Sequence, residues 1–290
     1  MGWCEYVGGV RFGLVASDLD GTLLRNDDTL SPRTKAAIDQ VVERSIFVMA
    51  TGRPPRWVHP VAELLGHRGL AVCSNGAIIM DLTDESIVDS QLLQPANARA
   101  AVALLQELLP GAGIAVDRLS GFGHDPSYKS AYTMPKNVRV APISELIGDE
   151  PMLKLMFRHP DMDTNVLALL IEAIGDRGAV TYGAAGPTSG MGALAYDADT
   201  PLSLANTLIE IQAPGVSKAA ALARVCDRFE IDHASTIAFG DMPNDIEMLT
   251  WVSHGVAMAN AHIDVKTVAN ELTASNDDDG VALILERELA

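Results

Sequence analysis

The stretch Ala16-Ser17-Asp18-Leu19-Asp20-Gly21-Thr22-Leu23-Leu24 places two acids directly after a short apolar segment. The preceding residues 13–15 (Gly-Leu-Val) predict a short buried strand that ends here. Side chains alternate along a strand, so Asp18 and Asp20 point to the same side at its end. Two carboxylates this close cost free energy unless a cation neutralises them or their pKa values separate. The stretch therefore predicts a functional site rather than a part of the core.

The turn after these acids carries residues that suit a polar site. Gly21 lets the backbone turn tightly, and Thr22 offers a hydroxyl group and a backbone N–H. The alternative interpretation is a strand end whose acids are simply solvated, which is common for an isolated pair. The full run DLDGTLL is longer and more specific, so we expect further parts of a site elsewhere in the chain.

Length and composition indicate two α/β domains. At 290 residues, the chain is long for one domain and comfortable for two. Its 48% hydrophobic and 20% charged residues are typical of a globular protein with a substantial core. Only 5% of the residues are aromatic, so the core must be mainly aliphatic, which suits layers of helices and sheet.

The charge and the cysteines restrict the partners and the compartment. The net charge of −17 repels nucleic acids and anionic membranes, so we expect neither as a partner. Residues 1–13 lack the pattern of a signal peptide, and no apolar run approaches the roughly 20 residues of a membrane span. Cys4, Cys73 and Cys226 are scattered and predict buried, reduced thiols. We therefore expect a cytoplasmic protein, either a monomer or a homodimer.

The chain on either side of its middle third alternates buried strands with helices. The expected strands are residues 45–50, 70–73, 236–239 and 255–258, and helices are expected from Ser31, Val58, Ser217, Ile246 and Val281. This alternation predicts a parallel, doubly wound sheet. Each strand ends in polar or glycine residues, and ligands of such sheets bind beyond the carboxyl ends of the strands. We therefore expect these ends to converge on one crevice.

The pattern changes between about residue 83 and residue 213. Helical patterns over 98–109 and 165–174 alternate with strand-like segments at 114–116, 152–157, 179–182 and 207–212. This arrangement predicts a separate α+β domain with an open-faced sheet and a loop at residues 183–192. The expected domains are thus a core of residues 1–82 and 214–290 and an inserted lid of residues 83–213.

Lys218 stands out in the return to the core. Residues 213–215 (Ala-Pro-Gly) form a plausible hinge, and Ser217 caps a helix over 218–229, so Lys218 lies in its first turn. A cation there opposes the helix dipole, so local stability does not explain it. Two interpretations remain open: a surface lysine, or a lysine that faces an anion at a helix N-terminus.

A second group of acids follows the strand at 236–239. Asp241, Asn244 and Asp245 lie where that strand ends. Either Asn244 or Asp245 alone would be interpreted as a helix cap, but Asp241 comes too early for that role. Three carboxylates with a hydroxyl group suit a hard, oxygen-preferring cation such as Mg²⁺. With a lysine added, the set suits a phosphoryl group in transfer.

The order of the motifs resembles that of one enzyme family. The motifs are DLDGTLL (18–24), TGR (51–53), SNGA (74–77), GVSK (215–218), GDMPNDIEML (240–249), GVAMANA (255–261) and NDDDGVA (276–282). Together they resemble the Cof-type subfamily of the haloacid dehalogenase-like phosphatases. The resemblance covers essentially all of the core. It implies a Rossmann-like core with an inserted C2-type cap, which agrees with the lid inferred from the pattern.

The resemblance also implies roles for individual residues. Asp18 would be the nucleophile, and Asp20 the general acid and then the general base. Mg²⁺ would be held by the Asp18 and Asp241 carboxylates and the Asp20 backbone carbonyl, with Asp245 orienting the metal-bound water. The phosphate group would be held by Thr51, Gly52, Lys218 and Asn244, and the substrate would be contacted by Arg53 and Asn75.

One position departs from the family pattern, which usually has glycine after the lysine. Here Ala219 follows Lys218. Alanine favours helix formation, so we expect Lys218 to keep its place. Within the cap, the candidates for substrate contact are Tyr128, Lys129, Tyr132, Lys154 and the loop at residues 183–192.

The implied function is Mg²⁺-dependent hydrolysis of small organic phosphate monoesters through an aspartyl-phosphate, with sugar phosphates or phosphorylated cofactors as substrates. One alternative is a phosphomutase or a dedicated sugar-phosphate phosphatase on the same core. A signalling receiver is disfavoured because it needs neither the second acid nor a lid. A non-enzymatic metal-binding protein would leave Lys218 and Thr51 without a role.

Overall fold

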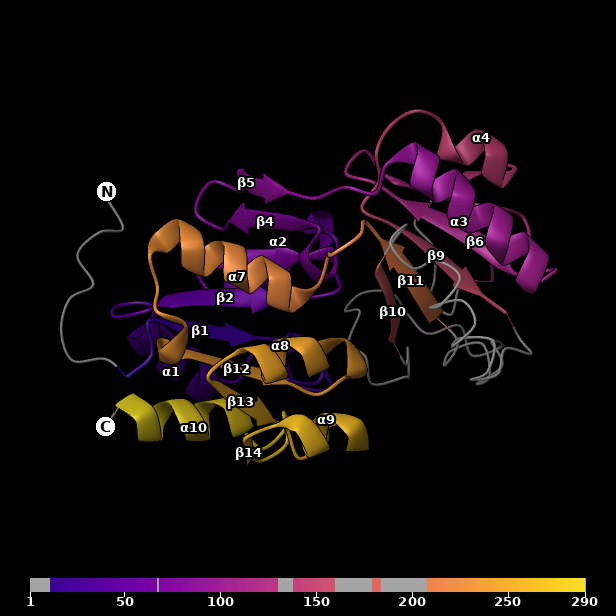
Figure 1. Ribbon diagram of the computed structural model, residues 1–290. Coiled ribbons are helices and arrows are strands. Elements are labelled where there is room, and N and C mark those ends of the chain that lie inside the picture. Colours follow the sequence, from indigo (N-terminus) through magenta and orange to yellow (C-terminus); the bar gives the residue numbers. More distant parts are fainter. Residues whose placement is uncertain (1–10, 67, 130–137, 160–178, 184–207, 290) are drawn as a thin grey trace. The chain divides into compact units, whose positions relative to one another are not determined.

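The computed structural model describes residues 11–66, 68–129, 138–159, 179–183 and 208–289 (Figure 1). The chain divides into two compact units. The first unit combines residues 1–90 with residues 217–290, and the second unit is the insertion between them, residues 91–216. The sequence placed the boundaries after residues 82 and 213, so both lie further along the chain than expected.

The first unit is built on a sheet whose described strands follow the order β14-β13-β12-β1-β2-β3-β4-β5. The strands are β1 (Leu14–Ser17), β2 (Ile46–Ala50), β3 (Leu70–Cys73), β4 (Ile78–Asp81), β5 (Ile87–Ser90), β12 (Thr236–Gly240), β13 (His254–Ala257) and β14 (Glu271–Leu272). Neighbours from β14 through to β3 are parallel, as the alternating pattern predicted. β1 lies at the centre and joins the two chain segments of the unit.

Burial explains why these short segments become strands. Every residue of β1, β2, β3 and β12 is buried, as expected for parallel strands that are covered on both faces. The helices of the unit are α1 (Pro32–Val41), η1 (Pro55–Trp57), α2 (His59–Leu64), η2 (Ser74–Gly76), α7 (Lys218–Phe229), η4 (His233–Ser235), η5 (Pro243–Asp245), α8 (Ile246–Trp251), α9 (Ile263–Val268) and α10 (Gly280–Leu289). Two helix pairs flank the sheet: α7 packs with α8, and α1 packs with α10 (Figure 1).

Two helices begin at the serines that the sequence predicted as N-caps. The Ser31 side chain accepts a hydrogen bond from the Thr34 N–H at the start of α1. The Ser217 side chain accepts one from the Ala220 N–H at the start of α7. Each bond satisfies a backbone donor that the first turn of a helix leaves without an intrahelical partner. The Ser217 cap fixes the start of α7, and with it the position of Lys218.

The edge of the sheet differs from the expectation. β4 pairs antiparallel with β3, and β5 pairs antiparallel with β4, so the segment up to Ser90 belongs to the first unit. The sequence had assigned residues from 83 onward to the insertion, because the strand–helix alternation stops there. The change of pattern marks a hairpin added to the sheet edge, and the insertion begins only after it.

The second unit contains a mostly antiparallel sheet in the order β10-β11-β9-β6-β7-β8. Its described elements are α3 (Pro95–Leu108), β6 (Gly113–Asp117), β7 (Phe122–His124), β8 (Arg139–Val140), α4 (Ile143–Ile147), β9 (Lys154–Arg158), β10 (Ala179–Gly183) and β11 (Leu208–Gln212). β7 and β8 are the parallel pair. In β9, the buried charged residues Lys154 and Arg158 stand at the two ends, and the buried apolar residues Leu155 and Phe157 lie between them. The α+β character expected for the insertion agrees with these elements.

Some expectations fall outside the part of the chain that the structure describes. These are the helix at 165–174, most of the loop at 183–192, and the residues Cys4 and Tyr132. Within the described part, Cys73 and Cys226 are buried free thiols, as predicted. None of the described helices has the length and apolar character needed to cross a membrane.

Candidate active site

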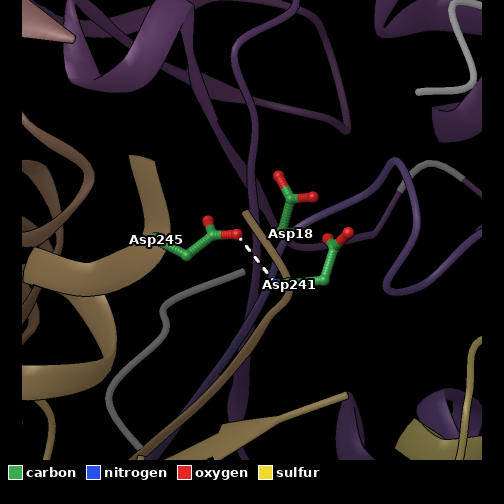
Figure 2. A group of neighbouring side chains, drawn as sticks. All are labelled: Asp18, Asp241 and Asp245. Carbon is green, nitrogen blue, oxygen red and sulfur yellow. Dashed lines mark hydrogen bonds between the residues drawn. The ribbon is translucent and has the colours of Figure 1, made fainter. Parts of the chain in front are cut away.

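Asp18 lies at the centre of the site because β1 is the central strand. It follows the last residue of β1, and its backbone N–H donates to the Phe239 carbonyl of the neighbouring β12 at 3.0 Å. The residue is only 5% exposed. Figure 2 shows its carboxylate beside those of Asp241 and Asp245, which come from the far end of the sequence.

Lys218 joins two of these acids. Its Nζ donates to Oδ1 of Asp18 and to Oδ1 of Asp245, each at 2.6 Å. The Lys218 side chain is fully buried, so the interpretation as a surface lysine is wrong. Burial alone would lower the pKa of Lys218, but the carboxylates of Asp18 and Asp245 outweigh it and hold the pKa above its ordinary value. The ammonium group is therefore a fixed positive charge next to Asp18.

Asp245 shapes the turn that carries Asp241. Its Oδ2 accepts the backbone N–H of Asp241 at 3.0 Å (Figure 2). The same oxygen accepts the backbone N–H of Met242 at 2.9 Å. Gly240 is needed at the start of this turn, since a Cβ there would lie 2.6 Å from the Cβ of Asp245. Both oxygens of Asp245 thus already have donors within the protein, which favours an indirect role toward a cation.

Asp241 is fixed by the turn that follows Asp20. The Thr22 hydroxyl donates to Oδ1 of Asp241 at 2.7 Å, across 219 positions of sequence. Gly21 has a φ of +80°, and a Cβ on it would lie 2.5 Å from Oδ2 of Asp241. Glycine is therefore required by its conformation and by its close approach to the acid. The turn at residues 18–22 and the turn at residues 240–241 are therefore in direct contact at this point.

The three acids form a group that can hold a metal ion. Ligand oxygens of Asp18, Asp241 and Asp245 lie within 4.8 Å of one another, and all three residues are buried. Burial raises the pKa of Asp18 to about 7, and Asp245 and Asp20 add to this, although Lys218 opposes it. Burial also raises the pKa of Asp241 well above its ordinary value, with Asp18 and Asp245 adding to the effect. Because Lys218 neutralises only one charge, a hard divalent cation fits this donor set.

Asp20 points to a different partner than Asp18. The Arg53 guanidinium binds its carboxylate through two bonds, Nη2 to Oδ1 at 2.5 Å and Nε to Oδ2 at 3.0 Å. Arg53 also lies 3.8 Å from Oδ1 of Asp28. Burial raises the pKa of Asp20, although the charge of Arg53 opposes this. Arg53, expected as a substrate contact, thus holds Asp20 in this structure.

Of the expected phosphate-binding residues, Thr51 and Gly52 follow β2 and Asn244 lies in η5. Asn75, an expected substrate contact, follows β3 in η2. Thr51 is fully buried; its carbonyl accepts the Asn75 N–H at 2.9 Å, and its hydroxyl accepts the Arg53 N–H at 3.0 Å. Asn75 has a φ of +54°, which asparagine adopts more readily than most residues. Its Oδ1 accepts the Asn244 side-chain amide at 3.1 Å and would lie 3.3 Å from a Cβ on Gly52. Gly52, Asn75 and Asn244 therefore form one cluster.

The expected cap contacts belong to the second unit and vary in exposure. Tyr128 is buried at 6% exposure, and Lys129 is exposed. Lys154 forms a buried ion pair with Glu210, which joins β9 to β11. Lys154 therefore has a partner inside its own sheet, a pairing that the sequence did not predict.

Three residues near the site were not predicted as parts of it. Asp28 faces Arg53, while Asn260 and Asn276 contact the backbone after Asp20. Both asparagines lie within the quoted motifs GVAMANA and NDDDGVA, so their motifs were noticed but their contacts were not. Asp28 lies in the polar run 26–28, where no site residue was expected.

Known proteins are similar to this chain in sequence and in architecture. A 5-amino-6-(5-phospho-D-ribitylamino)uracil phosphatase of Bacillus subtilis is 28% identical over 285 residues, covering 94% of this chain and 96% of the relative. A second enzyme of that name from the same bacterium is 27% identical over 274 residues, covering 94% of each chain. A haloalkanoate (HAD) superfamily phosphatase from Bacteroides thetaiotaomicron has a similar structure, with a TM-score of 0.75 at 20% identity, covering 99% of this chain and 97% of the other.

These likenesses confirm the predicted fold class, a Rossmann-like core with an inserted cap. The model of one family, the haloacid dehalogenase-like hydrolases, matches residues 15–285. That match spans nearly the whole chain and includes every motif quoted from the sequence. The chain therefore belongs to the haloacid dehalogenase-like hydrolases, as the order of its motifs predicted.

Proposed function

We propose that this protein is a Mg²⁺-dependent phosphatase that hydrolyses small organic phosphate monoesters through an aspartyl-phosphate on Asp18. The observation that carries the proposal is the buried contact between Lys218 and Asp18, next to Asp241. A lysine that touches the nucleophile is also placed to touch a phosphoryl group bound to it. Preorganised positive charge at such a position stabilises the transferring group in the transition state.

The first half of the proposed reaction transfers the phosphoryl group to the protein. A carboxylate oxygen of Asp18 attacks phosphorus, and the bond from phosphorus to the substrate oxygen breaks. Asp20 donates its proton to that leaving oxygen, for which its raised pKa is suited. Asp20 must first leave Arg53, so the guanidinium would then be available for the substrate.

The second half returns Asp18 to its starting state. Asp20, now a carboxylate, takes a proton from water, and the water oxygen attacks phosphorus. The bond from phosphorus to Asp18 breaks, and inorganic phosphate leaves. The phosphoryl oxygens would be held in both halves by Thr51, Gly52, Lys218 and Asn244.

Asp18 and Asp241 would bind the metal through their carboxylates, and Asp20 through its backbone carbonyl. Within the described residues, one oxygen of Asp18 and one of Asp241 accept hydrogen bonds, from Lys218 and Thr22. The second oxygen of each then remains to bind the ion. When bound, Mg²⁺ would neutralise the crowded acids and the phosphate charge.

The substrate class rests on the relatives. Two proteins similar along almost their whole length are named for a substrate with a phosphate ester on a ribityl group. We propose substrates of that chemical class for this chain: sugar phosphates, sugar-alcohol phosphates or phosphorylated cofactors. The acidic surface, with a net charge of −17, makes nucleic acid a poor alternative.

The test is hydrolysis of p-nitrophenyl phosphate with and without Mg²⁺, by the wild type and by Asp18→Asn. We expect metal-dependent turnover that Asp18→Asn lowers by more than about 1,000-fold, since the variant lacks the nucleophile. Asp264→Asn changes an exposed aspartate of α9 and serves as the matched control. Turnover by Asp18→Asn in a clean preparation would overturn the mechanism. If the variant is inactive, a panel of sugar phosphates assayed with the wild type would identify the natural substrate class.

A further inference from the structure

The backbone that follows Asp20 is held from the far end of the sequence. We propose that Asn260 and Asn276 are positioning residues, which fix the loop of residues 21–26 so that Asp20 meets the leaving group. The inference rests on the proposed function, because it assigns to Asp20 the role of acid and base. It adds two residues to which that proposal gives no role.

Asn260 holds the residue next to Asp20. Its Nδ2 donates to the Gly21 carbonyl at 2.8 Å, across 239 positions of sequence. Asn260 follows β13, one of the parallel strands whose carboxyl ends meet at the site. Its Oδ1 accepts the backbone N–H of Asn276 at 3.1 Å. One side chain thus connects the turn after Asp20 to the loop before α10.

Asn276 holds the other side of the same turn. Its Nδ2 donates to the Leu24 carbonyl at 2.9 Å and to Oδ1 of Asn26 at 3.1 Å. Leu24 in turn forms a bridge with Asp20 and donates its N–H to the Leu19 carbonyl at 2.9 Å. Asn276 is 4% exposed, and a buried amide of this kind is costly to leave without its acceptors. The contact therefore fixes Leu24, which fixes Asp20.

Two acids of the same loop extend this attachment. Asp277 accepts the backbone N–H and the side-chain amide of Asn26, at 3.0 and 2.6 Å. Asp279 accepts the Arg25 guanidinium at 2.9 Å. The supporting loop is itself closed, since the Thr273 hydroxyl donates to the Gly280 carbonyl at 2.7 Å. The loop before α10 therefore holds residues 21–26 at several points.

The two asparagines act on Asp20 and on the turn whose Thr22 hydroxyl binds Asp241, while the groups proposed to bind phosphate lie elsewhere. Thr51 belongs to the end of β2 and Lys218 to α7, and neither contacts the two asparagines through the bonds described above. A shift of residues 21–26 would thus move the acid and base without removing the groups proposed to bind phosphate. A displacement of about 1 Å in a reacting group costs on the order of 100-fold in rate. We expect kcat to fall while KM changes little.

The test compares Asn276→Asp and Asn260→Asp with the wild type. Each substitution keeps the shape of the side chain but replaces an N–H donor by an oxygen that faces a carbonyl. Asn270→Asp is the matched control, because it adds the same charge, and the Asn270 side chain accepts the Gly255 N–H at the amino end of β13, away from the site. Kinetics are measured with p-nitrophenyl phosphate at saturating Mg²⁺. Amide hydrogen exchange is followed by mass spectrometry for peptides covering residues 19–29.

The expected result is a fall in kcat of about 10- to 100-fold for both variants, with KM within about threefold of the wild type. Exchange at residues 21–26 is expected to become faster, while β1 and β2 keep their protection. Wild-type kcat in both variants, or unchanged exchange in the loop, would overturn the inference. An inactive wild type would instead contradict the proposed function, and the exchange data would still decide whether the two asparagines hold the loop.

Discussion

At the scale of single residues, Asp18 shows how burial prepares a site for a cation. Burial raises the pKa of Asp18 to about 7, so the folded protein binds a proton more tightly than the unfolded chain does. The stability from this difference is full below the unfolded pKa of about 4 and is lost as the pH rises through about 7. Without added metal, the charged form of Asp18 therefore destabilises the fold at pH 8.

Asp18→Asn tests this directly, because asparagine resembles the protonated acid at every pH. We expect the melting temperature of Asp18→Asn, relative to wild type, to rise by several degrees between pH 5 and pH 8 in the presence of a chelator. Each pH unit across this window corresponds to at most about 1.4 kcal/mol. Thermal unfolding followed by circular dichroism would measure it. A difference in melting temperature between variant and wild type that does not change with pH would contradict the prediction. Added Mg²⁺ at pH 8 should stabilise only the wild type.

Which residues could be predicted depended on whether a strand end places them. Asp18, Asp241 and Lys218 were expected together because they follow strands or begin a helix at one sheet edge, and the structure brings them together. Asn276 could not be predicted in the same way. Its contacts with Leu24 depend on the folded path of two loops about 250 positions apart. Local patterns carry no information on such a path.

At the scale of elements, the turn after β1 depends on a glycine. Gly21→Ala would place a Cβ at a φ of +80° and 2.5 Å from Oδ2 of Asp241. Gly66→Ala is a matched control in the same unit, since Gly66 has a φ of +69° and its nearest neighbour would be 4.0 Å away. We expect both variants to lose about 1 kcal/mol through the backbone. Only Gly21→Ala should also lose activity and Mg²⁺ affinity, by about tenfold or more, because it displaces Asp241.

Isothermal titration with Mg²⁺ and activity assays would separate the two effects. If Gly21→Ala bound Mg²⁺ as tightly as Gly66→Ala does, the close approach of this turn to Asp241 would not matter for metal binding.

The element boundaries themselves followed from composition: apolar runs predicted β2 and β3 within one residue. The β4–β5 hairpin was missed because β5 is a partly exposed edge strand, whose short segment lacks a clear apolar pattern.

At the scale of the whole molecule, the insertion divides the first unit in sequence but not in space. β1 lies between β2, from the first segment, and β12, from the second. The sheet is therefore incomplete until residues 217–290 are present. The insertion, in contrast, is continuous, and its two ends meet where the Gln91 side-chain amide donates to the Pro214 carbonyl at 2.7 Å. Such closely spaced ends are what allows one domain to be inserted into another.

This arrangement predicts how fragments of the chain behave. Residues 91–216 alone should unfold cooperatively on heating, because all the strands of their sheet lie within that fragment. Residues 1–90 alone should not, since β1 would lose β12 and leave a fully buried strand as an exposed edge. Joining residues 1–90 to 217–290 through a short glycine–serine linker should restore cooperative unfolding. Circular dichroism on the three fragments measures this, and a cooperatively folded 1–90 fragment would show that β12 is not needed to complete the core.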